Sequence, residues 1–529
     1  MKSLTPNFFY TLCFVGVITL YSITAQGQAE QTARYEREHK NNDLDYILLP
    51  MAEGGMVLIH DRDKYKEGKK LWEIITLNTD LTEVWTMEMD IEGRHRLVGY
   101  DYKDDLIYLL FRTSEHEGSD LNLFTIHAKT QEIKRYAIKQ ELTFKVTHFG
   151  ALSRAVVLGG YVNNDPAVLV YDLETENLKI VPGFFISETE LLDLRINANN
   201  TFNTLIMDRK TTEKKKLILK TFDATGAMLF DDIMEIDKKR SILSGITSTL
   251  KNDELLVVGT WSVGTSKQAS GIFSVLADPF RDQTINFYDF GSMEHFLEYQ
   301  SPKHAAKLKQ RSMAAKASGN IPDFKAYTSL MRMEEQPIGF AVLAEVYQPS
   351  ANFNSTSNYS GFNSPYYYGG YSPYGYNPFM NRYYNTPYQY NNGTSPTGET
   401  KLLYSSLLIF DLKGNLSQDY GITLDEKKAT GLEQTADFVF NKDEQTLAYK
   451  KEKDIFIKYN TPDRSILDTL QSTLQKPEEI VRSDSENGYV RFWYQNFMYS
   501  WGYQRIKDQA KQSEDPNRYV FYINKIRIN

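Results

Sequence analysis

Short apolar runs alternate with polar turns along most of this chain, and six of these runs end in one recurring hairpin pattern. Each hairpin joins two alternating apolar segments through a short polar turn. The residues that enter these turns are Asn78, His127, Asp172, Asp223, Asp411 and Asn460. Residues of these types bond their own backbone or tolerate turn dihedrals, so each position predicts a tight turn.

The hairpins recur at a nearly constant spacing. Neighbouring turn entries lie 49, 45 and 51 residues apart, and the last two lie 49 apart. Another apolar strand precedes each hairpin, and usually one more precedes that strand; GGMVLIH at 54–60 and RAVVLGGYV at 154–162 are examples. In a β-propeller, four short strands form one blade, and the pattern repeats about every 45 to 50 residues. A stack of β-sandwiches is the alternative, but it predicts no fixed four-strand repeat.

Seven units of this kind can be counted, and an eighth, aromatic-rich segment begins at Glu478. We therefore predict a single all-β propeller with eight four-stranded antiparallel blades. Seven blades is the alternative, because the chain from Asp43 to Met51 could pair with the terminal strands and change the count. Closure is expected, since an open last blade would leave unpaired strand edges. The chain resembles the β-propeller superfamily, and WD40-like and TolB-like propellers in architecture only, because no Gly-His and Trp-Asp pair recurs.

Two insertions lie in the long gap between Asp223 and Asp411. Residues 291–323 connect the fifth and sixth blades, and their alanine-rich basic stretch predicts a helix that starts at Ser301 and Pro302 and stops at Gly319. Residues 350–399 form a loop rich in Tyr, Asn, Gly and Pro between the second and third strands of the sixth blade. Because strands in a blade alternate in direction, both insertions are expected to emerge side by side on one face.

These insertions supply the predicted binding site. Tyrosine offers a large amphipathic contact area, which is why it is common where proteins touch partners. The predicted partner-binding residues are Tyr366, Tyr367, Tyr368, Tyr371, Tyr374, Tyr376, Arg382, Tyr383 and Tyr384 in the loop, and Lys303, Lys307, Lys309 and Arg311 in the helix. Other interpretations stay open. The loop could be a structural lid or a linker. The helix could meet anionic lipid headgroups or an acidic protein patch, or it could pack through Leu308 and its alanines with its lysines in water.

The chain begins in the pattern of a secretory signal peptide. An apolar run from Phe8 to Leu20 follows a basic start, and Ala25 and Gly27 precede a plausible cleavage position before Gln28. An uncleaved membrane anchor is the alternative, although this run is short for a bilayer span.

The predicted organisation is a signal peptide at 1–27, a lead-in at 28–44 and a propeller at 45–529 that carries the two insertions. The one cysteine, Cys13, lies within the signal peptide. The mature chain is therefore expected to have no disulfide, no thiol chemistry and no transmembrane span.

Candidate chemistry is sparse. The sequence has no HExxH, GxSxG, GxGxxG or P-loop motif, and its eight histidines do not pair at metal-ligand spacing. The acidic cluster at Asp101, Asp104 and Asp105 lacks the glycine and the terminal glutamate of a calcium loop. A net charge of −8, together with export, argues against nucleic acid as a partner. We predict no catalytic residue, no metal and no cofactor.

These observations lead to one functional prediction and one alternative. The prediction is an exported, non-catalytic propeller that serves as a protein-binding or scaffolding subunit in the periplasm, in an outer-membrane complex of a Gram-negative bacterium, or outside the cell. Recognition is expected on the face that carries the tyrosine-rich loop and the basic helix. The alternative is a carbohydrate-binding or carbohydrate-active propeller, in which aromatic rings stack on the sugar and two carboxylates act as acid and base.

Overall fold

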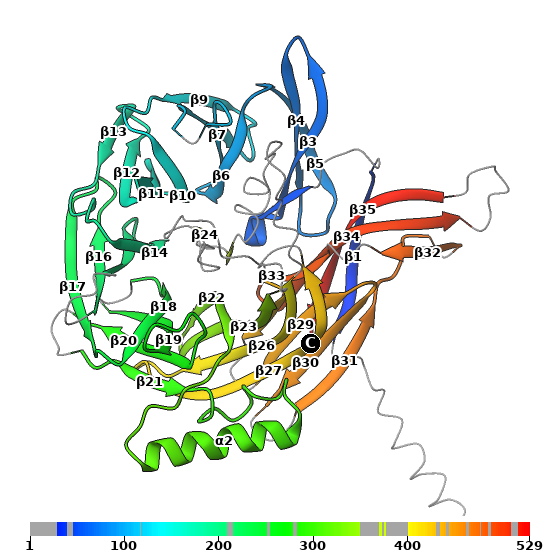
Figure 1. Cartoon of the computed structure of the whole chain (residues 1–529). Coiled ribbons are helices and arrows are strands. Elements are labelled where there is room, and N and C mark those ends of the chain that lie inside the picture. The colour runs from blue at the N-terminus through cyan, green and yellow to red at the C-terminus, as the bar shows by residue number, and fades with distance from the viewer. Residues whose placement is uncertain are drawn as a thin grey trace, which may run out of the picture.

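A computed structural model shows eight β-sheets arranged in a ring, which confirms the predicted eight-bladed propeller (Figure 1). In blades two to six the first strand lies toward the centre of the ring and later strands lie further out, whereas in blade eight the strand toward the centre is β33. The structure describes residues 29–39, 46–116, 118–208, 215–250, 254–278, 283–349, 370–372, 375–376, 400–429, 434–440, 444–461, 465–476, 478–484, 488–508 and 517–529.

Blades one to four follow each other along the chain. Blade one contains β2 (Ile47–Pro50), the short 3-10 helix η1 (Ala52–Gly54), β3 (Met56–Lys66), β4 (Lys69–Leu77) and β5 (Glu83–Glu92). Blade two contains β6 (Arg96–Lys103), β7 (Leu106–Arg112), β8 (Leu121–His127) and β9 (Ile133–Ile138). Blade three contains β10 (Phe144–Ala151), β11 (Ala155–Val162), β12 (Asp165–Asp172) and β13 (Asn177–Ile180). Blade four contains β14 (Thr189–Ile196), β15 (Phe202–Asp208), β16 (Lys215–Phe222) and β17 (Met228–Ile236).

Blades five to eight complete the ring and carry the insertions. Blade five contains β18 (Arg240–Thr247), β19 (Leu255–Val263), β20 (Gly271–Ala277) and β21 (Asn286–Asp289), and helix α2 (Pro302–Ala317) follows it. Blade six contains β22 (Tyr327–Gln336), β23 (Gly339–Pro349), β26 (Thr400–Phe410) and β27 (Leu416–Ala429). Blade seven contains β28 (Ala436–Phe440), β29 (Gln445–Lys451), β30 (Asp454–Asn460) and β31 (Ser465–Gln471). Blade eight contains β32 (Glu479–Asp484), β33 (Tyr489–Tyr494), β34 (Phe497–Asp508), β35 (Asn517–Ile528) and β1 (Ala29–Glu38).

The predicted turn-entry residues lie at the end of the third strand of a blade or directly after it, and five of the six accept backbone N–H groups of their own turn. The Oδ1 of the sixth, Asn460, accepts the Ser465 hydroxyl at 2.8 Å. The Asp172 carboxylate accepts the backbone N–H groups of Glu174 and Thr175 at 2.9 and 2.8 Å. Asp223 and Asp411 accept two backbone N–H groups each in the same way. In both of these turns the third residue after the aspartate is a glycine with φ +76°, a conformation that favours glycine. The sequence repeat therefore corresponds to the blade repeat.

The core is divided into eight apolar clusters, and each cluster lies between two neighbouring blades. Inner strands are covered on both faces, so β11 and β14 are buried at every residue. A β-bulge interrupts the first strand of blades two to six a few residues after its start. Because a bulge bends and twists its strand, this recurring irregularity fits the strong twist of a blade.

The ring is closed by the N-terminal strand. β1 pairs antiparallel with β35 from Ala29 opposite Ile528 to Glu38 opposite Val520, and so becomes the outermost strand of blade eight. The described part of the predicted lead-in, residues 29–39, thus belongs to the propeller. The alternative in which residues 43–51 pair with the terminal strands differs from the structure, because Ile47–Pro50 forms the first strand of blade one.

Candidate functional site

The tyrosine-rich loop leaves blade six and reaches the centre of the ring. It connects β23 to β26, as predicted, and Pro349 lies opposite Thr400 where the two strands end. Within the loop, β24 (Gly370–Ser372) and β25 (Gly375–Tyr376) form a small antiparallel pair. β24 also pairs in parallel with β14, with Gly370 opposite Leu194 and Tyr371 opposite Arg195. Part of the loop therefore adds to the inner edge of blade four, near the centre of the view in Figure 1.

The structure describes only some of the predicted loop residues. Tyr371 and Tyr376 lie in β24 and β25, where their backbones pair with each other. The remaining predicted loop residues lie outside the described residues: Tyr366, Tyr367, Tyr368, Tyr374, Arg382, Tyr383 and Tyr384. Their role as binding residues stays a prediction.

Helix α2 forms within the predicted insertion and lies at the outer rim of the ring, beside blades five and six (Figure 1). Its inward face is held by Asp289, the last residue of β21. The Ser312 hydroxyl donates to this carboxylate at 2.5 Å, and the Lys316 ammonium lies 2.5 Å from its other oxygen. Lys309 donates to the carbonyl of Glu294 at 2.8 Å. The helix is thus a packed element with a fixed orientation.

The residues before the helix, 290–300, are named here the rim segment, and one carboxylate fastens them to blade six. Asp419 of β27 accepts the backbone N–H groups of Glu294, His295 and Phe296 at 2.8, 2.7 and 2.9 Å. Phe296 stacks on Phe290 with ring centroids 3.9 Å apart, and both rings are buried. The chain is therefore drawn along the outside of blade six before the helix begins.

These positions correct the prediction that the two insertions lie side by side. The described part of the loop is bonded to the innermost strand of blade four, whereas α2 is bonded to the outermost strand of blade five and lies outside the ring. The prediction was based on strand direction alone. Strand direction does not include the contacts of Asp419, which hold the rim segment outside the ring. The described residues do not form one continuous surface from the two insertions.

Replacing Asp419 with alanine is expected to release the rim segment without unfolding the ring. Three backbone N–H groups would lose their acceptor, and each such loss costs about 1–3 kcal/mol when the group stays buried. Amide hydrogen exchange should accelerate in residues 290–317 and stay unchanged in blades one to three. Asp411→Ala is the matched control, since it removes a carboxylate that caps two N–H groups in an exposed turn of the same blade. Equal exchange at 290–317 in both variants would contradict this assignment.

Carboxylates near the centre of the ring join neighbouring blades. Asp101 of blade two accepts the backbone N–H of Ala151 in blade three at 2.8 Å. Asp193 of blade four accepts the N–H and the hydroxyl of Thr247 in blade five at 2.7 and 2.8 Å. Burial raises the pKa of Asp193 to about 6, although Arg195 opposes the shift.

Carboxylates also join blade six to blade seven and blade seven to blade eight by accepting backbone N–H groups. Asp437 accepts the backbone N–H of Phe492 at 2.9 Å and pairs with Arg332 at 2.6 Å. One oxygen of Glu345 accepts the N–H groups of Thr435 and Ala436 at 2.7 and 2.8 Å. These four carboxylates serve the joints between blades, so none of the four is free to act in an acid and base pair for sugar cleavage. The described residues also contain no group of three or more His, Cys, Asp or Glu that could hold a metal ion.

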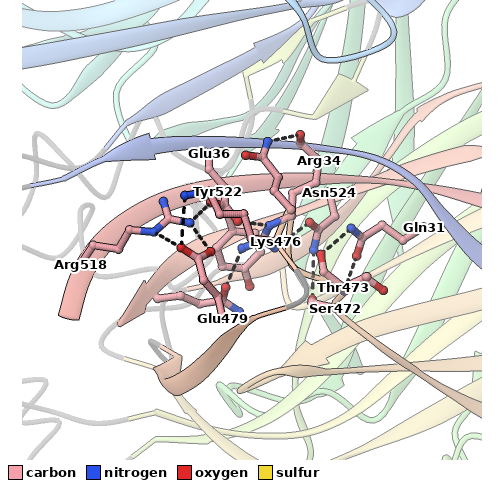
Figure 2. Close-up of polar contacts among 12 residues, drawn as sticks. Gln31, Arg34, Glu36, Ser472, Thr473, Lys476, Glu479, Arg518, Tyr522 and Asn524 are labelled. Carbon is pink, nitrogen blue, oxygen red and sulfur yellow. Dashed lines mark hydrogen bonds and ion pairs between the residues drawn. The ribbon is translucent and has the colours of Figure 1, made fainter. Parts of the chain in front are cut away.

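A polar network at the closing strand was missed by the sequence analysis (Figure 2). Arg518 of β35 bridges Glu36 of β1 and Glu479 of β32, with N–O distances of 2.5 and 2.6 Å. Arg34 donates to Glu36 at 2.6 Å and to Asn524 at 2.9 Å. Burial alone would raise the pKa of Glu36, but the two arginines hold it below its ordinary value.

A second layer of this network lies deeper and joins blade seven to blade eight. The Lys450 ammonium donates to Asp484 at 3.0 Å, and their side chains are 0% and 1% exposed. Asp484 also accepts Gln504 at 2.8 Å and the Tyr522 hydroxyl at 3.0 Å. Charged residues at these positions give no signal in an apolar pattern, which is why the sequence predicted a closed ring but did not indicate that β1 closes it.

Comparisons with known proteins identify no family for this chain. No protein-family model matches the sequence, and no curated protein matches it. The structure is similar to the polysaccharide lyase Uly1, with a TM-score of 0.36 and 8% identity over 92% of this chain and 100% of that one. It is also similar to prolyl oligopeptidase B from Galerina marginata, with a TM-score of 0.39 and 8% identity over 91% of this chain and 56% of that one. A Synechocystis apocarotenoid oxygenase gives 0.30 and 8% over 44% of this chain and 59% of that one.

Nothing about function follows from these similarities. In the part of the chain that the structure describes, no helix combines the length and the apolar character needed to cross a bilayer.

Proposed function

We propose that this chain is an exported, non-catalytic β-propeller that acts as a protein-binding or scaffolding subunit in the periplasm or in an outer-membrane complex. The tyrosine-rich loop is its main docking element. The observation that supports this most is the position of β24, which places part of a blade-six loop on the inner edge of blade four. A loop that crosses the ring in this way lies where a partner approaching the centre of the face would meet it.

Two further observations favour binding over catalysis. The loop contains eleven of the 36 tyrosines of the chain, and aromatic residues are enriched at the centres of protein interfaces. The four carboxylates described at the blade joints accept backbone N–H groups, and Asp437 also pairs with an arginine, so these four support the ring and do not supply the acid and base pair that the carbohydrate-active alternative needs.

The proposal is tested by removing the loop without disturbing blade six. Pro349 and Thr400 are register partners, so residues 350–399 can be replaced by the two-residue turn Asn-Gly, which suits a hairpin of this kind. We expect affinity purification from the native cell envelope to recover a partner with the full chain and to lose it with the shortened chain. The two proteins should have the same melting temperature.

A second variant separates the loop's tyrosines from its length. It keeps all residues of 350–399 but replaces each tyrosine with serine, and it should lose the partner as the deletion does. Recovery of the same partners with the full chain and the deletion would show that the loop is not the docking element. If the serine variant recovers the partner and the deletion does not, the loop is needed but its tyrosines do not make the contact.

A further inference from the structure

Helix α2 presents three cations to solvent in a row, named here the basic stripe. Lys303, Lys307 and Arg311 follow each other at intervals of four residues, so they lie on one face of the helix over about 12 Å. All three are exposed, and none forms an ion pair with a residue that the structure describes. The helix itself contains no Asp or Glu.

The opposite face of the helix explains why the stripe points outward. Lys309 and Lys316 are already bonded to Glu294 and Asp289, and Ser312 is buried. Leu308 and Ala305 pack against the apolar cluster between blades five and six. Two of the five cations of the helix are therefore used inside the protein, and the other three are held at the rim of the ring.

The chemistry of the outward face suits a flat anionic surface better than a protein pocket. The exposed residues three positions after each cation are Ala306, Gln310 and Ala314, and the one large exposed apolar side chain of the helix is Met313. A stable protein interface is usually centred on aromatic or aliphatic anchors that fill pockets, and the stripe offers none. Cations alone are complementary to closely spaced, mobile phosphates such as those of lipid headgroups.

We propose that the basic stripe binds anionic phospholipid headgroups, so that the rim of blades five and six rests on a membrane surface. This goes beyond the proposed protein binding, and it does not depend on the tyrosine-rich loop. Each Lys or Arg near an anionic leaflet contributes about 1 kcal/mol. Removal of three such charges should therefore weaken vesicle binding roughly a hundredfold, and added salt should weaken the binding of the unchanged chain.

The test uses the full mature chain and vesicles of phosphatidylcholine with or without phosphatidylglycerol. Co-sedimentation is measured for the unchanged chain and for the triple variant Lys303→Ala, Lys307→Ala and Arg311→Ala. The control is the triple variant Lys129→Ala, Lys134→Ala and Arg154→Ala, which removes the same charge from exposed sites on blades two and three. A third variant lacks residues 350–399.

The proposal predicts binding to phosphatidylglycerol vesicles that falls about a hundredfold in the helix variant and less than threefold in the control. The chain without the loop should bind these vesicles as the full chain does, which separates this result from the protein-binding test. Equal losses in the two triple variants would overturn the proposal, since net charge alone would then explain binding. Failure of the full chain to bind also overturns it, and retention on an immobilised polyglutamate peptide by the full chain alone would then assign the stripe to an acidic protein.

Discussion

Replacing Asp484 with alanine is expected to lower the free energy of unfolding by about 3–5 kcal/mol, because it leaves a buried charge without its partner. The Lys450 ammonium is 3.0 Å from this carboxylate, and neither side chain has appreciable contact with water. Burial lowers the pKa of Lys450, and Asp484 opposes that shift. The variant would also leave the Tyr522 hydroxyl and the Gln504 amide without an acceptor.

An exposed ion pair provides the control. Lys129 lies 2.7 Å from Asp105 in blade two, but the two side chains are 74% and 41% exposed. Exposed pairs contribute about 1 kcal/mol or less, so Lys129→Ala, which removes the exposed partner and leaves Asp105 in place, should have a small effect. Urea unfolding followed by tryptophan fluorescence measures both variants. If the two variants differ by less than about 1 kcal/mol, the buried pair does not hold the closing blade as argued.

A double variant distinguishes the loss of a partner from the loss of packing. Lys450→Met with Asp484→Leu removes both charges and keeps much of the side-chain volume. Such replacements of buried pairs are often neutral or stabilising, so the double variant should recover most of the stability that Asp484→Ala loses. A double variant as unstable as Asp484→Ala would mean that the network acts through its hydrogen bonds to blade eight.

The blades were predictable from sequence because their signals are local. Asp172 and Asp411 bond backbone groups two to four residues ahead, so the turn is encoded within the turn itself. The apolar strands between turns are buried on both faces by neighbouring blades, which makes them continuous apolar runs. The helix over 302–317 was predicted for the same reason, since Pro302 and Gly319 mark its ends.

Ring closure by β1 could not be predicted in this way. Its sequence, AEQTARYERE, contains few apolar residues, and its buried positions include the charged pair Arg34 and Glu36. These side chains are buried because Arg518, Asn524 and Gln504 neutralise or bond them from β35 and β34. Those partners lie more than 400 residues away in the chain, so no local pattern reveals them.

The candidate site was predicted only in part, because its position depends on contacts between residues that are far apart in the chain. The position of the loop in blade six followed from strand order and is confirmed. The separation of the two insertions depends on Asp419, whose carboxylate lies more than 120 residues from the N–H groups it accepts. A contact of this kind decides where a connection runs, and the sequence of the connection itself does not contain it.

The stability of the ring should also fall as pH rises through neutrality, because of Glu345 in β23. Its side chain is fully buried, and burial raises its pKa to about 7 against the opposing effect of N–H groups from Ala436 and Thr435. The unfolded chain releases this proton near its ordinary pKa of about 4.5, whereas the folded chain keeps it until about pH 7. The folded state therefore binds more protons in this window, and stability is lost as pH rises through it.

A shift of this size corresponds to about 3 kcal/mol between pH 4.5 and pH 7, and above pH 7 the cost is constant. Glu345→Gln cannot ionise, and its amide oxygen can still accept the N–H groups of Thr435 and Ala436. We expect urea unfolding between pH 6 and pH 7.5 to show a stability change that is more negative for the unchanged chain than for the variant. Buried His148, whose pKa burial lowers to about 4, adds the same rising contribution to both proteins below about pH 6.5, so the difference between the two profiles reports Glu345. Asp193 titrates near pH 6, so part of the slope at lower pH should remain in the variant.

Glu132→Gln provides the matched control for this pH profile, because Glu132 lies in an exposed turn of blade two with its side chain 64% exposed. The control should keep the slope of the unchanged chain at every pH, since it removes a solvent-exposed carboxyl and leaves Glu345 in place. Parallel profiles for Glu345→Gln and the unchanged chain would show that Glu345 is already ionised in the fold. In that case the two backbone N–H groups and the Ser405 hydroxyl at 2.8 Å would be sufficient to hold a buried carboxylate at the joint of blades six and seven.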